Sequence, residues 1–376
     1  MNLGLVVYGS LELVSGGYLY DRLLVENLRK RGMRVELLSL PWRNYVRHLA
    51  DNFSGSLPRA VEAMSPDLFL QDELNHPSLF YLNQRLQKSL KGPIIAIVHH
   101  LRSSEARPAW QNGLYRRVEK RYLESVDGFI FNSETTRAVV RELLGKETPS
   151  VVACPGGDHM GSPISVEGIT ERCRRPGPLR ILFTGSVIPR KGLHILISAL
   201  GLLAHEGWEL TVAGSLSADA PYAGRIRQLI AGSGLEERVK LLGTVSHEQL
   251  VGLLESHQCL AVPSFYEGFG IVFLEAMRFG APVLATTAGA IPEVVADGRE
   301  GFLVPPGDAD ALAEAVDRLI RDRDLLLTMS LAAWKRSFGH PTWAEGAARV
   351  EKFLQEMVRR KKAAAAKGGR AHGDPG

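Results

Sequence analysis

The stretch Arg180-Ile-Leu-Phe-Thr-Gly-Ser-Val-Ile-Pro-Arg-Lys-Gly192 decides the fold of this chain. Its first five residues are an apolar run that predicts a buried strand, and residues 185–191 form a glycine-containing loop. An amphipathic helix is expected from residue 192 to about residue 205, and a second apolar run follows at 209–213. This order of strand, loop, helix and strand predicts parallel strands joined by a right-handed crossover.

The same pattern occurs at the start of the chain. An apolar run at 3–8 is followed by a loop through Gly16 and Gly17, a helix to about residue 31, and a strand at 34–40. The repetition indicates an internal duplication of architecture, and 376 residues exceed what one hydrophobic core usually supports. We therefore predict an α/β protein with two doubly wound domains and a cleft between them.

The remaining elements follow from further apolar runs and amphipathic stretches. Strands are expected at 67–70, 93–98, 128–131 and 150–153 in the first half, and at 239–242, 258–263, 282–285 and 301–304 in the second. Helices are expected at 246–255, 271–278, 309–321 and 342–358.

Glycine, serine, proline and arginine replace the hydrophobic pattern between residues 158 and 178, which predicts an interdomain linker there. The domains are therefore expected at 1–168 and 178–340. The tail, 361–376, is rich in alanine, glycine and lysine and is predicted to be disordered because it cannot bury a core.

Composition narrows the class of protein. The net charge of +4 is modest and partly carried by the tail, so no nucleic-acid partner is expected. Cys154, Cys173 and Cys259 have no CxxC spacing, which favours a reducing compartment over disulfides or a zinc site. The apolar start lacks a basic segment, which is typical of a strand and not of a signal peptide, and no run of about 18 apolar residues predicts a spanning helix. We expect a cytoplasmic protein, with peripheral contact to the inner face of a membrane left open.

The segment Glu267-Gly-Phe-Gly-Ile-Val-Phe-Leu-Glu275 is the most informative for chemistry. A glycine-broken loop, with Gly268, Phe269 and Gly270, turns directly into a helix at Ile271, and a helix N-terminus binds anions through its free amides. Glu275, on the second turn, is within reach of a diol such as a ribose, and Glu267 would face a sugar. The strand before the loop favours this interpretation over two solvated glutamates, because open α/β sheets bind ligands at the carboxyl ends of their strands.

The loop from Gly185 to Gly192 also follows a strand and opens a helix. Arg190 offers a planar fork of donors and Lys191 a compact charge, a combination that suits a diphosphate. Solvated surface cations are the alternative. The loop is not a Walker A motif, because no Ser or Thr follows its lysine.

The D-x-D sequence Asp308-Ala-Asp310 precedes an expected helix. Helix capping accounts for it better than a clamp for a metal diphosphate.

Two further regions are candidates for acceptor binding. Asp72, Glu73 and His76 follow the strand at 67–70, where a polar cluster is expected to face the cleft. The stretches 84–91 and 115–121 are basic with apolar neighbours and would suit an anionic membrane if the acceptor is a lipid, although most such helices are solvated faces.

These motifs resemble those of a known family. Residues 267–275 are similar to the E-x7-E motif of the retaining family 4 glycosyltransferases of GT-B fold, and residues 185–192 are similar to their G-x5-KG phosphate loop. The resemblance covers nearly the whole chain and includes four further segments: 15–17, the strand ending in His99, the turn 155–158, and 289–306.

The resemblance implies a GT-B fold of two Rossmann-like domains whose last helix, 341–360, crosses back to the first domain. It implies that Glu267 contacts the donor sugar, Glu275 the ribose, and Arg190 and Lys191 the diphosphate. His99 would lie near the transferred sugar, whereas its neighbour His100 is better interpreted as a hydrogen-bonded structural histidine. The backbone of Gly243 to Val245 would contact the base, and Gly16 and Gly17 would approach the diphosphate from the other domain. Ser186 stands where many relatives have arginine, so Arg190 is expected to compensate.

The implied reaction moves a sugar from a nucleotide diphosphate sugar to a hydroxyl acceptor with retention of configuration, without a metal or cofactor. The leaving phosphate can accept the acceptor's proton, so cations and positioned amides matter more than a basic carboxylate.

Three alternatives were weighed. A nucleotide-sugar epimerase would need acid and base groups around the sugar, and none is apparent. A dinucleotide-dependent oxidoreductase is disfavoured because no G-x-G-x-x-G follows either first strand. A catalytically silent sugar-nucleotide binding subunit is disfavoured by the presence of Glu267, Glu275 and Lys191, and a turnover assay distinguishes it.

Overall fold

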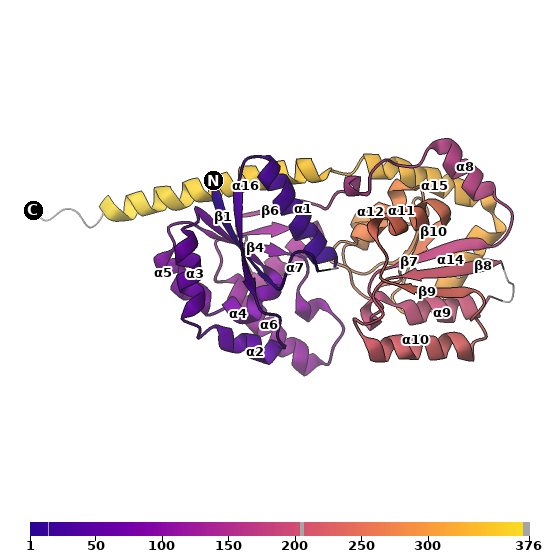
Figure 1. The fold of residues 1–376 in the computed structure, drawn as a ribbon, viewed down its shortest axis with the longest axis horizontal. Coiled ribbons are helices and arrows are strands. Elements are labelled where there is room, and N and C mark those ends of the chain that lie inside the picture. The colour runs from indigo at the N-terminus through magenta and orange to yellow at the C-terminus, as the bar shows by residue number, and fades with distance from the viewer. Residues whose placement is uncertain (14, 204–206, 371–376) are drawn as a thin grey trace, which may run out of the picture. The chain divides into compact units, whose positions relative to one another are not determined.

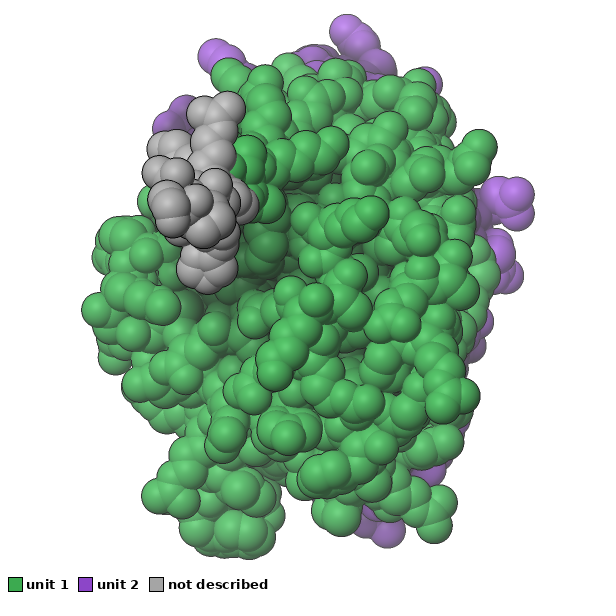
Figure 2. Space-filling model, turned by 90° about the vertical axis from the view of Figure 1, so that its left-hand side faces the viewer, with its two compact units in different colours: residues 1–155, 343–376 green, residues 156–342 purple. Residues whose placement is uncertain are grey.

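The computed structural model describes residues 1–13, 15–203 and 207–370 (Figure 1). They form two compact units (Figure 2). Unit 1 contains Met1–Pro155 and the chain from Trp343 onward, and unit 2 is Gly156–Thr342. Each unit is built on one six-stranded parallel sheet with helices on both faces (Figure 1).

The sheet of unit 1 has the strand order β2-β1-β3-β4-β5-β6, and every pairing is parallel. The chain goes from β1 outward to β2 and then returns to place β3 on the other side of β1. The strand order therefore reverses between β1 and β3, which is the switch point of this sheet. The strands are β1 (Asn2–Tyr8), β2 (Arg34–Leu40), β3 (Leu68–Asp72), β4 (Ile94–Val98), β5 (Gly128–Phe131) and β6 (Ser150–Val152).

The helices of unit 1 bury apolar faces against this sheet. In α1, Tyr20, Leu24 and Leu28 recur at four-residue spacing and are almost fully buried. The α-helices are α1 (Gly16–Lys30), α2 (Tyr45–Asp51), α3 (Ser56–Met64), α4 (His76–Leu79), α5 (Leu82–Ser89), α6 (Ala109–Leu123), α7 (Glu134–Leu144) and α16 (Trp343–Arg370), and the 3-10 helices are η1 (Glu73–Asn75) and η2 (Arg102–Ser104).

The sheet of unit 2 has the order β12-β11-β10-β7-β8-β9 and is also parallel throughout. The chain moves from β7 through β8 to β9 and then returns to place β10 on the other side of β7, so the switch point lies between β7 and β10. The strands are β7 (Leu179–Thr184), β8 (Trp208–Ala213), β9 (Val239–Gly243), β10 (Cys259–Ala261), β11 (Val283–Thr286) and β12 (Gly301–Val304).

Helices cover both faces of this second sheet as well (Figure 1). They are η3 (Asp158–Met160), α8 (Val166–Arg174), η4 (Pro189–Lys191), α9 (Leu193–Gly201), α10 (Ala220–Gly232), α11 (His247–Ser256), α12 (Ile271–Arg278), α13 (Ile291–Val294), α14 (Ala309–Arg321) and α15 (Arg323–Phe338).

The prediction of two doubly wound α/β domains is confirmed, and each expected strand is present within a few residues of its predicted bounds. The first crossover helix of unit 2 ends at Gly201, short of the predicted residue 205, and residues 204–206 lie outside the described part of the chain.

The predicted linker at 158–178 is wrong. Unit 1 ends at Pro155 and not at residue 168, and the segment that follows belongs to unit 2 and contains α8. Arg172 of α8 is buried and donates hydrogen bonds to the carbonyl oxygens of Leu254, Glu255, Phe279 and Gly280 at 2.7 to 3.3 Å. One guanidinium thus satisfies carbonyl groups at the ends of α11 and α12, which fixes α8 to this unit.

The predicted disorder of 361–376 is also wrong for its first part, because α16 continues to Arg370. Alanine is the strongest helix former, and Lys361 pairs with Asp127 at 3.0 Å, so the helix is extended along unit 1. Residues 371–376 lie outside the described part of the chain. Helix α16 packs against α1 and β6 of unit 1.

Candidate functional site

The switch point of unit 2 brings together the loops that follow β7 and β10. Gly192, at the end of the first loop, has a φ of 71°, and a Cβ there would lie 2.1 Å from the carbonyl oxygen of Pro263. The amide of Phe265 also donates to the carbonyl of Arg190 at 2.8 Å. Only glycine allows this approach, so the two loops form one unit of structure at the carboxyl edge of the sheet.

Three predicted site residues converge there. The Lys191 Nζ lies 2.6 Å from Glu267 Oε1, and the Arg190 Nη1 lies 3.3 Å from Glu267 Oε2. Ser264 donates from its hydroxyl to the same Oε1 at 2.5 Å, and Arg190 also donates to the carbonyl of Tyr266 at 2.6 Å. The loop after β7 thus supplies two cations to a carboxylate that the loop after β10 supplies.

Burial sets the electrostatics of this cluster. Desolvation raises the pKa of Glu267, but Lys191 and Arg190 outweigh it and lower that pKa to about 2. The pKa of Lys191 is lowered, mainly by desolvation. Glu267 opposes this shift, whereas the nearby charge of Arg190 adds to it. The carboxylate is therefore ionised at neutral pH, and two cations lie close together in a largely buried place.

Helix α12 begins beside this cluster. Gly270 precedes it with a φ of 93°, and no side chain caps the helix start, so the amides around Ile271 keep the orientation that binds anions. Glu275 is on the second turn, is 5% exposed, and also contributes to the electrostatic field at Lys191. Phe269 is buried with its ring against His340.

Sequence reasoning missed His159, whose Nε2 donates to Glu275 Oε1 at 2.9 Å. The residue follows the turn at 155–158 that carries part of the family resemblance, but its partner is 116 residues away. No local pattern connects the two side chains.

The other predicted residues of unit 2 lie along the same edge of the sheet. The amide of Gly185 donates to the carbonyl of Ala213 at 3.0 Å, and Ser186 follows it in the loop after β7. Gly243 and Val245 come at and just after the end of β9, two strands away from β7. The structure therefore places the expected base-binding backbone on the same edge as the cations, but not against Arg190.

The D-x-D sequence is a helix cap, as expected. Asp308 Oδ1 accepts from the amide of Ala311 at 2.9 Å at the start of α14.

The switch point of unit 1 carries a different set of groups. A Cβ at Gly17 would lie 3.1 Å from the ring of His99, so glycine lets α1 begin close to this side chain, whereas no described atom lies within 4 Å of a Cβ built at Gly16. The His99 Nε2 donates to Asp21 Oδ1 at 3.1 Å, and Asp21 is fully buried. Asp21, which sequence reasoning missed, therefore orients the predicted histidine.

The carboxylates around His99 govern its charge. Burial alone would lower the pKa of His99. The negative charge of Asp21 outweighs burial, Asp72 and Glu73 act in the same direction as Asp21, and the pKa rises to about 9. Burial and the proximity of Asp21 raise the pKa of Asp72. Unit 1 thus holds a protonated histidine among buried carboxyl groups at neutral pH.

The three acceptor-side candidates are buried within unit 1 and do not form an exposed row. Asp72 accepts from the amide of Leu74 at 2.9 Å. Glu73 is 5% and His76 1% exposed, and the His76 Nε2 lies 3.1 Å from the Tyr45 hydroxyl. His100 makes the expected hydrogen bond, to Glu105 at 2.9 Å, but its side chain is only partly buried.

Two groups of side chains in the described residues have donor atoms within 4.8 Å of one another, the geometry in which metal ions are held. One is Asp21, Asp72 and His99, and the other is Glu73, His76 and Glu119. No metal or cofactor was expected for this protein as a whole, and both groups lie in unit 1, away from the donor loops of unit 2.

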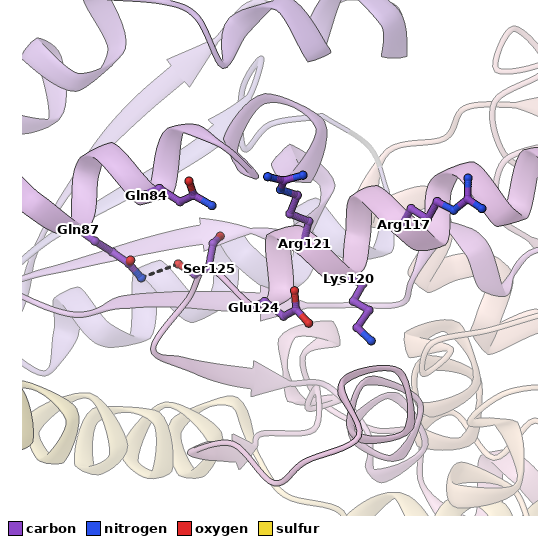
Figure 3. Close-up of a pocket in the computed structure, with 7 residues that line it drawn as sticks. All are labelled: Gln84, Gln87, Arg117, Lys120, Arg121, Glu124 and Ser125. Carbon is purple, nitrogen blue, oxygen red and sulfur yellow. Dashed lines mark hydrogen bonds between the residues drawn. The ribbon is translucent and has the colours of Figure 1, made fainter.

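Both stretches, 84–91 and 115–121, contribute to one pocket of 570 Å³, which Glu124 and Ser125 also line. Figure 3 shows that α5 supplies Gln84 and Gln87 and that α6 supplies Arg117, Lys120 and Arg121, whose side chains project in different directions. Helices α5 and α6 therefore present cations and amides to a shared hollow. Within the described residues, no helix has both the length and the apolar character needed to cross a bilayer.

Both halves of the chain match family models. Residues 172–336 match the model described as Glycosyl transferases group 1, and residues 20–159 match the one described as Glycosyltransferase Family 4.

Curated relatives include enzymes with several activities. An exopolysaccharide phosphotransferase of Streptomyces coelicolor is 30% identical over 331 residues, which cover 84% of this chain but 32% of that protein. A D-inositol 3-phosphate glycosyltransferase of Corynebacterium jeikeium is 30% identical over 64% of this chain and 60% of its own length. A phosphatidyl-myo-inositol mannosyltransferase of Mycobacterium leprae is 28% identical over 95% of this chain and 97% of that protein. The chain thus spans about a third of the first relative, 60% of the second and nearly all of the third.

Solved structures share the fold. The sucrose-phosphate synthase of Thermosynechococcus elongatus superposes with a TM-score of 0.82 at 22% identity, covering 96% of this chain and 99% of that one. The Anabaena protein HepE in complex with UDP and glucose gives 0.73 at 20% identity, covering 94% and 99%.

Proposed function

Because this chain belongs to the group 1 and family 4 glycosyltransferases and has their GT-B fold, we propose that it transfers a sugar from a nucleotide diphosphate sugar to a hydroxyl group of an acceptor. The observation that carries the proposal is the convergence of Arg190, Lys191 and Glu267 at the switch point of unit 2, beside the uncapped start of α12. A diphosphate is the ligand that matches two adjacent cations and free helix amides.

The donor would occupy the edge of this sheet. Arg190 and Lys191 would exchange their contacts with Glu267 for contacts with the diphosphate oxygens, and the released carboxylate would accept hydrogen bonds from sugar hydroxyls. Glu275, held by His159, would bind the ribose diol. The backbone of Gly243 to Val245 would contact the base.

Sugar transfer itself would proceed with retention of configuration. The acceptor oxygen bonds to the anomeric carbon on the face from which the diphosphate departs, and the electron pair of the broken carbon–oxygen bond remains on the phosphate. The acceptor proton passes to that phosphate oxygen. Lys191 and Arg190 would stabilise the charge that develops there, so no metal is required in this scheme. The family resemblance assigns His99, Gly16 and Gly17 of unit 1 to the same reaction, and we propose that His99 acts in the transfer step.

A panel of UDP-, GDP- and ADP-sugars tests the proposal. Thermal unfolding should show a higher Tm with the matching donor, since a ligand bound only by the folded state stabilises it by about 2.7 kcal/mol at a hundred times its Kd. Glu275→Gln should abolish most of that shift. Glu248→Gln, on the exposed start of α11, is the matched control and should keep it.

The proposal fails if none of these nucleotide sugars is bound, hydrolysed or transferred. It also fails if Glu275→Gln responds to the donor as the unmodified protein does. Turnover with the matching donor separates an enzyme from a silent binding subunit.

The acceptor side is proposed to approach an anionic membrane through the basic pocket between α5 and α6. Replacing Arg117 and Arg121 with glutamine should weaken binding to vesicles that contain phosphatidylglycerol, by about 1 kcal/mol per cation. Lys240→Gln, an exposed cation of unit 2, should leave it unchanged. Equal binding to pure phosphatidylcholine vesicles would argue against a membrane role. We also propose a cytoplasmic location, as the cysteine pattern of the sequence predicts.

A further inference from the structure

We propose that Glu73, His76 and Glu119 of unit 1 bind one divalent cation that fixes helix α6 to the segment after β3. Their donor atoms lie within 4.8 Å of one another, and the three residues are 5%, 1% and 0% exposed. This site is separate from the donor loops of unit 2, so this proposal does not depend on the proposed sugar transfer.

Two elements supply the ligands. Glu73 begins η1 and His76 begins α4, three residues later, so both side chains project from one turn of chain directly after β3. Glu119 comes from the inner face of α6, whose neighbouring Arg117 and Lys120 are exposed. A cation between them would therefore tie a helix to the carboxyl edge of the sheet.

Unpaired buried oxygens are the observation that points to a ligand. Glu119 is fully buried, and its Oε1 accepts from the amide of Ser103 at 3.1 Å, but its Oε2 has no hydrogen-bond partner among the described residues. The Oε1 of Glu73 likewise accepts no hydrogen bond, although the His76 Nδ1 is 3.1 Å away. A buried carboxylate oxygen without a partner is costly, and a cation shared by both carboxylates removes that cost.

Hydrogen bonds orient the imidazole of His76. The His76 Nδ1 lies 3.0 Å from the carbonyl of Glu73, and its Nε2 lies 3.1 Å from the Tyr45 hydroxyl. Binding a cation through Nδ1, which also lies 3.1 Å from Glu73 Oε1, would replace the bond to the Glu73 carbonyl and leave Nε2–H on the Tyr45 hydroxyl, and a bond at the second nitrogen fixes the tautomer and ring orientation of a metal-binding histidine.

The donor set selects the class of cation. Two carboxylates and one imidazole suit Zn²⁺ or Mn²⁺, whereas Mg²⁺ prefers an octahedron of oxygens and most of its waters. Ligands bound tetrahedrally at about 2.1 Å are roughly 3.4 Å apart, close to the 3.1 Å between His76 Nδ1 and Glu73 Oε1. Arg102 also lies near this group: its guanidinium stacks over Tyr45 and Tyr115 at 5.3 and 4.9 Å, and its charge opposes the rise in the pKa of Glu73 that burial causes.

Metal content of the full chain, purified without a histidine tag, tests the site. After incubation with Zn²⁺ or Mn²⁺ and desalting, mass spectrometry should find about one equivalent per chain, and the Tm should fall on treatment with EDTA and recover when the metal is returned. Glu119→Gln, which keeps the shape of the side chain, should reduce bound metal at least tenfold. Glu124→Gln, at the exposed end of the same helix, should retain it.

Three outcomes would overturn the assignment. The first is an unmodified protein that holds no stoichiometric metal and whose Tm does not respond to either ion, which would mean that the carboxylates share a proton instead. The second is a Glu119→Gln variant that keeps its metal. The third is metal that is lost in Asp21→Asn but not in Glu119→Gln, which would assign the ion to the other group. If Glu119→Gln does not fold, the site is still tested by the Tm of the unmodified protein after its metal is removed with EDTA and then returned.

Discussion

The two sheets are both parallel and doubly wound, with different strand orders, and they present opposite chemistry at their switch points. In unit 2, between β7 and β10, Arg190 and Lys191 surround one carboxylate, so the edge has an excess of positive charge. In unit 1, between β1 and β3, the buried carboxyls of Asp21 and Asp72 surround one histidine. The two edges therefore suit different chemistry: one suits an anionic ligand, and the other holds a protonated histidine among carboxyl groups.

Both edges rely on glycine for the same physical reason. At Gly192 the backbone of one loop touches that of the next, and at Gly17 a helix start touches the ring of His99. The two glycines allow different contacts. Gly192 brings two loops of unit 2 together, whereas Gly17 lets the start of α1 approach His99 in unit 1. The predictions below test how far the two edges differ, beginning with the largest effect.

The largest effect is expected from the cations of unit 2. Lys191→Met keeps much of the side-chain volume but removes the charge, and loss of one preorganised charge-stabilising group typically lowers kcat about 10² to 10³-fold. It also leaves Glu267 buried with Arg190 alone, and breaking a buried ion pair costs about 3 to 5 kcal/mol of folding stability. Steady-state kinetics with the matching donor, together with denaturant unfolding, measure both.

A matched substitution in unit 1 tests whether the loss of donor binding is specific to unit 2. His99→Gln removes the charged group of the other edge and should leave donor affinity within a few fold of the unmodified protein. Equal losses of donor affinity in the two variants would contradict the division of roles between the edges.

The backbone comparison should give an intermediate effect. Gly192→Ala imposes a Cβ at a φ of 71° and 2.1 Å from the Pro263 carbonyl, so the loops must separate. We expect a loss of about 2 to 4 kcal/mol, which is in the upper range for single substitutions. Urea unfolding measures the change.

Gly16→Ala is the control in unit 1, where a Cβ meets no described atom within 4 Å. It should change stability by less than about 0.5 kcal/mol. A destabilisation as large as that of Gly192→Ala would show that the two glycines serve the same purpose.

Much of this fold could be predicted from the sequence, because central strands such as β3 and β4 are fully buried and mostly apolar, as expected of a parallel sheet, whereas the edge strands β2 and β9 contain charged residues. The motif residues Arg190, Lys191 and Glu267 could also be found, since loops at the carboxyl ends of neighbouring strands must meet. The expected linker was wrong for a different reason. Arg172 lies within the stretch of glycine, serine, proline and arginine, and only the folded chain shows that it donates to four carbonyl groups.

Asp21 and His159 could not be found by pattern either. Asp21 lies in an amphipathic helix where an acidic residue is unremarkable, and its partner His99 is 78 residues away. Glu119 is similar, because its position among the basic residues of α6 indicates a solvated salt-bridging face, whereas the side chain is fully buried. Pairings of this kind depend on packing between elements, which local periodicity does not encode.

The smallest effect concerns the proton on His99, and it tests the electrostatic difference between the edges directly. The pKa of His99 is raised to about 9, above the ordinary value of 6.5, mainly because Asp21 outweighs desolvation. The stability that this histidine contributes is therefore complete below pH 6.5 and is lost as the pH rises through 9. Glu267 shows the opposite pH dependence, since its lowered pKa of about 2 contributes stability above pH 4.5 that is lost as the pH falls toward 2.

Asp21→Asn should lower the pKa of His99 by at least one unit, about 1.4 kcal/mol, measured by NMR titration of the imidazole. Glu12→Gln, an exposed acid of the same unit, should leave it unchanged. A His99 that titrates near 6.5 in the unmodified protein would mean that unit 1 holds a neutral imidazole, and the contrast in charge between the two switch points would then rest on the carboxyl groups alone.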